Sequence, residues 1–283
     1  MRKLPAVLLL GSLIVGTCMF FLVRASNMNT LNVNIGRNIV ETAKQSGAPR
    51  FSVESHWGAT FYEIVDLPPD IFVRYIRPGY EIGVQPLFAL TMYADTENNN
   101  DMAVEELTMQ FSRHAATTHE DAQLFVDALI VQFRRGSWKR YFEDGCPAIT
   151  GRSAYLDLEE RVKTSCPLDP AYRMSSGDWR ALMKWPQRYV WLGDGVIATL
   201  SLQYDEDARG LTYSIGLELQ DFAIYNRRNA AEEARLLAEG DAKGWHSTGE
   251  NQKEMAETKV KVRRLEENAM KRGDTVVSRD AKK

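Results

Sequence analysis

The chain has 283 residues, of which 44% are hydrophobic and 26% charged, a composition that excludes a collagen-like or wholly disordered protein. Its 35 basic and 38 acidic residues leave a formal net charge of -3. Nucleic-acid-binding domains usually carry a basic excess, so we expect no nucleic acid among the partners.

The N-terminus carries an export signal. Arg2 and Lys3 precede an uncharged apolar run, Leu4 to Val23, which Arg24 ends. A run of about 20 residues is long enough to cross a bilayer core as a helix, and the leading basic residues place the N-terminus in the cytoplasm. We therefore predict that residues 1–24 form a signal anchor. The protein would cross the inner membrane once, with its remaining residues in the periplasm.

Two other outcomes for this segment stay open. Small or aliphatic residues near Ala25 are typical of a signal-peptidase site, and acylation of Cys18 would make the chain a lipoprotein. All three possibilities export the rest of the chain. The exported part then carries 35 − 3 = 32 basic residues against 38 acidic ones, a net charge of −6.

The next segment, residues 25–50, is rich in asparagine and poor in large apolar residues, so we predict a linker with a short helix near 38–44. Residues 51–283 are predicted to form a single exported α+β domain. Its first part contains β-branched and aromatic runs, separated by Pro-Pro and Pro-Gly pairs, that predict strands. These runs are residues 51–53, 61–65, 72–75 and 88–93.

A helical section is predicted to begin near Asp101 and to break near Thr117. The helix after the break has the clearest periodicity in the chain, because apolar residues from Ala122 to Phe133 fall on one stripe. Thr118 and Asp121 form a plausible N-terminal cap, and Gly136 ends the run.

Beyond Cys18, the chain contains one cysteine pair, Cys146 and Cys166. In an oxidising compartment the pair is expected to form a disulfide, which would stabilise the fold by about 3 kcal/mol. The alternative is two buried free thiols. Neither cysteine has a second ligand at the short spacing of zinc sites, so we assign no metal.

Alternating apolar and polar residues predict two strands, 196–204 and 211–219, with a turn between them. The turn Gly193-Asp194-Gly195 joins an earlier strand, 188–192, to them. This meander near 188–221 favours an α+β fold with an antiparallel sheet and packed helices. Two helices, 229–239 and 250–272, are predicted to follow. The second has a narrow apolar seam, typical of a solvated helix lying on its own domain or of a helix offered to another protein.

Motifs of catalysis are absent from the sequence: it has no metalloprotease spacing, nucleophile elbow, P-loop or dinucleotide-binding turn. The four histidines are not spaced as a site, and the pairs Glu105-Glu106 and Glu159-Glu160 are expected to titrate independently. We therefore assign no catalytic residue and no cofactor, and expect a protein that is not an enzyme.

From Gly79 to Ser112 the chain has acidic residues but no Lys or Arg. Such a stretch is typical of a docking face for a basic protein. The alternatives are a solvated loop followed by the first turn of a helix, and a calcium site formed by residues 95, 97, 99 and 101. The predicted partner-binding residues are Asp95, Glu97, Asp101, Glu105 and Glu106.

Four groups of residues between Phe61 and Val277 carry a family resemblance. They are Asn99–Val104; Gln132-Phe133 with Gly136 and Trp138; Trp191–Val196; and Gly240–Trp245. In these segments the chain resembles envelope proteins that accompany type VI secretion lipase effectors in Gram-negative bacteria, some of which act as immunity proteins. The resemblance implies a membrane-tethered periplasmic inhibitor that binds a lipase-type toxin and contributes no catalytic residue. An adaptor or envelope-assembly factor that escorts a secreted protein is the second hypothesis, and an envelope enzyme the third.

Overall fold

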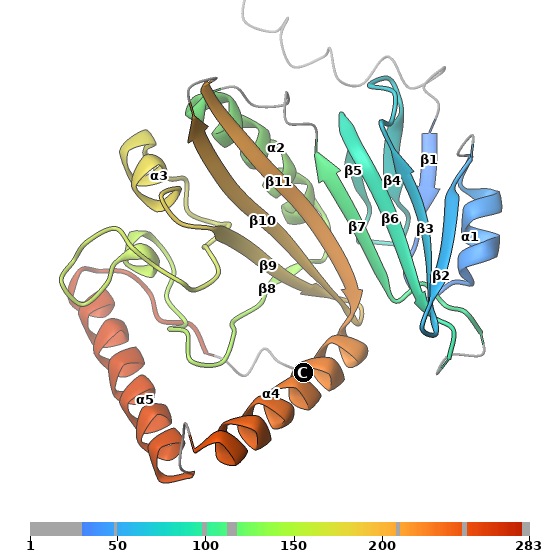
Figure 1. Cartoon of the computed structure of the whole chain (residues 1–283). Coiled ribbons are helices and arrows are strands. Elements are labelled where there is room, and N and C mark those ends of the chain that lie inside the picture. The colour runs from blue at the N-terminus through green and yellow to red at the C-terminus, as the bar shows by residue number, and fades with distance from the viewer. Residues whose placement is uncertain are drawn as a thin grey trace, which may run out of the picture.

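The computed structural model describes residues 30–47, 50–97, 101–111, 118–207, 210–244 and 248–278. Figure 1 shows a large twisted sheet with helix α2 against one face and two long helices, α4 and α5, standing away from it as a bent arm. The elements are β1 (Thr30–Val33), α1 (Ile39–Gln45), β2 (Ser52–His56), β3 (Ala59–Val65), β4 (Phe72–Tyr75), β5 (Ile82–Val84), β6 (Leu87–Asp95), β7 (Glu106–Phe111), α2 (His119–Arg135), β8 (Lys139–Arg140), the 3-10 turn η1 (Arg152–Tyr155), α3 (Ser176–Leu182), β9 (Gln187–Gly193), β10 (Val196–Asp207), β11 (Gly210–Asp221), α4 (Phe222–Lys243) and α5 (Thr248–Lys271).

The predicted α+β fold with an antiparallel sheet is confirmed. Eight strands form the main sheet in the order β2-β3-β6-β7-β11-β10-β9-β8, and every neighbouring pair is antiparallel. The predicted meander corresponds to β9, β10 and β11, which are joined by tight turns as the sequence indicates. A smaller sheet, β1-β4-β5, lies beside it, with β1 parallel to β4.

Helix α2 covers the inner face of the main sheet. Its predicted apolar stripe is buried, and Phe133 stacks on Trp191 of β9 with ring centroids 3.9 Å apart. The Thr118 hydroxyl accepts a hydrogen bond from the Asp121 amide at 3.0 Å, which confirms the predicted N-cap. One hydrophobic cluster runs from Leu31 to Ala269, so both sheets share a core.

The linker predicted for residues 25–50 is wrong over the part that the structure describes. Leu31 and Val33 of β1 and Ile39 of α1 are buried in the core. Of the asparagines in this segment, Asn32 lies within β1, and the Asn38 side chain caps α1 by accepting hydrogen bonds from its first amides. These residues belong to the folded domain, because β1 pairs with β4 some 40 residues later in the chain.

The helix predicted to begin near Asp101 is also wrong. Residues 106–111 form β7, in which Leu107, Met109 and Phe111 are buried and the intervening residues face outward. This period of two fits a strand and not a helix. The two C-terminal helices are confirmed as helices, although α4 begins earlier than predicted, directly after β11.

The predicted anchor, residues 1–24, lies outside the described residues. Within the described ranges, no helix is both long and apolar enough to cross a bilayer.

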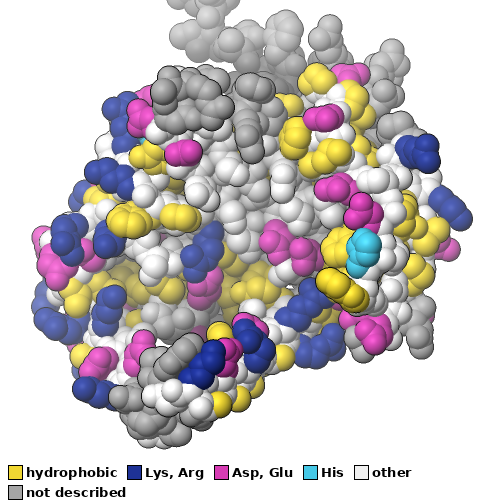
Figure 2. Space-filling model, in the orientation of Figure 1, with side chains coloured by type: hydrophobic (Ala, Val, Ile, Leu, Met, Phe, Trp, Pro, Cys, Tyr) yellow, Lys and Arg dark blue, Asp and Glu magenta, His cyan; other side chains and the backbone are white. Residues whose placement is uncertain are grey.

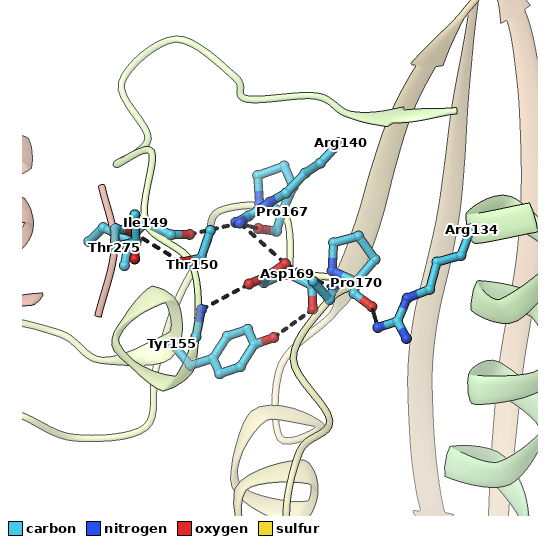
Figure 3. A network of polar contacts seen from close by, with 11 residues as sticks. Arg134, Arg140, Ile149, Thr150, Tyr155, Pro167, Asp169, Pro170 and Thr275 are labelled. Carbon is cyan, nitrogen blue, oxygen red and sulfur yellow. Dashed lines mark hydrogen bonds and ion pairs between the residues drawn. The ribbon is translucent and has the colours of Figure 1, made fainter. Parts of the chain in front are cut away.

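The predicted disulfide is present, since Cys146 and Cys166 are bonded with their Cα atoms 5.7 Å apart. It closes an irregular loop that a buried polar network also holds (Figure 3). At its centre, Arg140 lies 3.5 Å from Asp169 and donates a hydrogen bond to the Ile149 carbonyl at 2.7 Å. Burial lowers the pKa of Arg140.

Asp169 also organises the loop through its backbone contacts. Its carboxylate accepts hydrogen bonds from the amides of Gly151 and Ala171, each at 2.9 Å, and its carbonyl accepts one from the Tyr155 hydroxyl (Figure 3). This rigid loop receives the end of α5, where Ala269 is buried. The C-terminal half of α5 therefore packs on its own domain, while its N-terminal half stands free of the sheet (Figure 1).

Candidate protein-binding surface on the open sheet face

The main sheet has one face without a covering helix, which we call the open face. Figure 1 looks onto this face, with α2 behind the strands. Inward-pointing residues of each strand are buried, whereas the alternate residues of β3, β6, β7, β10 and β11 remain partly or fully exposed. Figure 2 shows acidic side chains gathered over the middle and right-hand part of this face. An antiparallel sheet can present such a polar face to water, so its charge pattern decides what it can bind.

One cross-strand row of the open face contains two glutamate side chains. Strand pairing aligns Glu63, Thr91, Thr108, Glu218 and Thr199 across five strands. The Thr91 hydroxyl donates a hydrogen bond to Glu63 at 3.3 Å, which fixes that carboxylate on the open face. These five residues therefore include two carboxyl groups and no basic side chain.

The neighbouring row aligns Phe61, Tyr93, Glu106 and Gln220. The rings of Phe61 and Tyr93 lie 5.2 Å apart, and Gln220 donates a hydrogen bond to Glu106 at 2.9 Å. This row combines an exposed aromatic pair with a further carboxylate, two features that protein interfaces use for burial and for orientation.

Arg228 of α4 reaches the acidic centre of this face. Its guanidinium lies 2.8 Å from Glu105 and 3.6 Å from Glu106, and 4.9 Å from the centre of the Tyr93 ring. Burial, followed by the negative charge of Glu106, raises the pKa of Glu218 to about 7, although Arg228 acts in the opposite direction. One guanidinium thus faces three carboxylates, and the centre keeps a negative excess at neutral and higher pH.

Beside Glu218 the open face is hollowed by about 350 Å³. Gly216 has no side chain there, and its neighbours on the floor are the polar residues Gln110, Ser201 and Ser214. At the far end, Arg188 donates a hydrogen bond to Glu143 at 2.9 Å, so its charge is already compensated. The hollow has room for a partner side chain next to Glu218, and a Lys or Arg would meet the carboxylate there.

The structure brings some of the predicted partner-binding residues to this face. Asp95 and Glu106 lie on β6 and β7. Glu97 follows β6, and its amide donates a hydrogen bond to the Gly58 carbonyl at the tip of the β2–β3 hairpin. The neighbouring residue of that tip, Trp57, is fully exposed. The acidic edge of the face therefore ends beside an aromatic side chain of the type that anchors protein complexes.

Two predicted residues differ from the others. Glu105 lies at the acidic centre but is only 4% exposed, and its carboxylate pairs with Arg228, so little of it is accessible to a partner. Asp101 lies away from the centre, beside α1, where its carbonyl accepts a hydrogen bond from Asn38 at 2.8 Å. The alternative in which these acids open a helix is wrong, because β7 begins at Glu106.

The calcium alternative depends on Asn99, which lies outside the described residues. Within the described part of the chain, no group of three or more His, Cys, Asp or Glu side chains is placed to hold a metal ion. His119 has another partner, since its Nδ1 lies 2.6 Å from the hydroxyl of Tyr213 in the core.

Three important residues of the site, Glu63, Glu218 and Arg228, were not predicted from the sequence. Alternation along residues 211–219 places Glu218 on the polar side of a strand, whereas Glu63 shares its side of residues 61–65 with Phe61 and Val65. That signal does not say which strands are neighbours. The meeting of Arg228 with Glu105 joins residues 123 positions apart, which no local pattern indicates.

Comparison of the chain with protein-family models, curated proteins and solved structures finds no match in any of the three. The functional interpretation consequently depends on the geometry and charge of the open face.

Proposed function

We propose that this protein is a membrane-tethered periplasmic binding protein of the immunity type, which neutralises a lipase-type effector of type VI secretion by holding it against the open face. The observation that carries the proposal is the acidic centre of this face, where Glu105, Glu106 and Glu218 share the guanidinium of Arg228 and Glu63 adds a carboxylate on the same cross-strand row as Glu218. A basic patch on the toxin would compensate that excess and orient the complex.

The energetics of Glu218 support a binding role. A carboxylate whose pKa is raised by burial and by a neighbouring carboxylate destabilises the free protein when it ionises. Natural proteins retain such groups where function requires them. A partner Lys or Arg in the adjacent hollow would relieve this penalty, so part of the binding free energy would come from Glu218 itself.

Two further observations fit the periplasmic part of the proposal. The Cys146–Cys166 disulfide is of the kind that persists in an oxidising compartment. The apolar run before Arg24 would hold the domain at the membrane that a lipase attacks, and a tether of this kind raises the local concentration of the inhibitor.

The test is co-expression of the full chain with candidate lipase-type effectors of type VI secretion, followed by co-purification and a lipase assay. We expect a stoichiometric complex with loss of lipase activity. Binding without inhibition would instead favour an adaptor that escorts the effector. No binding to the effector would refute the proposal.

The role of the open face is tested by reversing two of its charges, Glu63→Lys together with Glu218→Lys. We expect association to slow by about tenfold or more at low salt, and the difference from the unaltered protein to shrink at high salt, because screening weakens steering. The matched control is Glu41→Lys on α1, an exposed glutamate away from this face. An association rate that responds equally to both changes would remove the open face from the interface.

A further inference from the structure

A second recess lies away from the acidic centre, between α5 and the disulfide-closed loop. It has a volume of about 750 Å³. It is distinct from the hollow beside Glu218, although Pro186 lines both. Figure 2 shows hydrophobic side chains set back in the hollow between the α4–α5 arm and the rest of the molecule, with basic side chains around its rim.

The recess has a mixed lining, and one part of it is apolar. Leu156 and Leu158 from the loop face Val262 and Leu265 of α5, and Trp185 closes one side while remaining 54% exposed. Beyond Leu158, which lines both spaces, the recess continues along α5 as a shallower hollow of about 630 Å³. The apolar surface is therefore elongated, and the domain itself leaves it uncovered within the described residues.

The charges around the recess are unevenly compensated. Asp157 and Glu159 both pair with Arg161, at 2.7 and 2.6 Å. The two lysines of the lining, Lys163 and Lys261, form no ion pair among the residues that the structure describes. Lys163 lies 5.2 Å from the centre of the Trp185 ring, which holds its ammonium group at the edge of the apolar floor.

We propose that this recess binds a single-chain anionic amphiphile, whose acyl chain lies over Leu158 and Trp185 and whose headgroup meets Lys163 and Lys261. A volume of this size lies within the range of small-molecule sites, which combine an apolar lining with a few placed polar groups. An elongated apolar floor with uncompensated ammonium groups at its edge matches an acyl chain that carries one carboxylate or phosphate. This inference does not depend on the identity of the protein partner.

The experiment uses the full chain in envelope membranes and a palmitate analogue that carries a photoactivatable diazirine. After illumination, mass spectrometry locates the labelled residues. We expect labelling within residues 156–166 and 253–265. Unlabelled oleate and lysophosphatidylglycerol should compete, whereas hexadecanol and hexadecyltrimethylammonium should not. Competition by only one of the two anionic lipids would identify the headgroup as carboxylate or phosphate.

Variants give the second measurement. The double substitution Lys163→Ala with Lys261→Ala should weaken labelling about tenfold, the effect of two partly exposed charge contacts. Its control is Lys259→Ala, an exposed α5 lysine outside the recess. Trp185→Glu should abolish labelling, with Leu124→Glu on α2 as the control for an exposed apolar residue.

Cooperative unfolding of each purified variant in urea, followed by tryptophan fluorescence, reports that the domain has folded. Three outcomes in folded protein overturn the proposal. Labelling is absent, it spreads evenly over the chain, or it does not respond to Trp185→Glu and to the lysine substitutions.

Discussion

Replacement of Glu218 by Gln tests whether the centre of the open face is destabilised by its own charge. The raised pKa of Glu218, about 7 against an ordinary value of 4.5, means that the folded state keeps a proton that the unfolded state has already released. Between pH 4.5 and 7 the unfolded state therefore binds fewer protons. The free energy of unfolding falls as the pH rises through this window, and the loss is complete above pH 7.

The size of the effect follows from the same pKa. A displacement from 4.5 to about 7 corresponds to an upper limit of about 3 kcal/mol, at 1.36 kcal/mol for each pH unit. Glu218 is only partly buried, so solvent screening leaves a contribution on the order of 1 kcal/mol. We expect Glu218→Gln to raise the free energy of unfolding by that amount at pH 8 and to leave it unchanged at pH 4.

Urea denaturation at pH 4 and pH 8, followed by tryptophan fluorescence, measures the difference. The control is Glu63→Gln, which removes an exposed carboxylate from the same cross-strand row and should change stability by less than about 0.5 kcal/mol. An equal effect of Glu218→Gln at both pH values, or a loss of stability at pH 8, would refute the electrostatic interpretation of this site.

Three further changes test the framework around the open face. Replacing Cys146 and Cys166 by Ser should lower the free energy of unfolding by about 3 kcal/mol, because the bond closes a loop of 20 residues; a thermal melt measures this. Asp169→Ala should cost about 3–5 kcal/mol by leaving the buried Arg140 without its ion pair, and equal denaturation midpoints would contradict it. Phe133→Ala should cost a similar amount through the cavity left beneath the sheet, and calorimetry would expose a smaller loss.

The sequence by itself determined the elements whose signal is local. The stripe from Ala122 to Phe133 and its cap specify α2, because residues three and four apart share one side of a helix. Alternation and tight turns specify the meander of β9 to β11. The number of cysteines predicts the disulfide, because an exported chain with one cysteine pair beyond Cys18 can form one bridge within that pair.

Only the tertiary structure decided which distant segments meet. Leu31 and Val33 are too few apolar residues to predict a core strand, and they become buried because β4 and α1 pack around them. The sequence predicts a helix where β7 lies, because the acidic residues before it resemble the first turn of a helix. Its pairing with β6 and β11 makes it a strand. Local periodicity records which side of an element is apolar, whereas strand order and register come from long-range contacts. The open face owes its acidic centre to those contacts, which set Glu218 beside Glu106 and bring Arg228 to both of them.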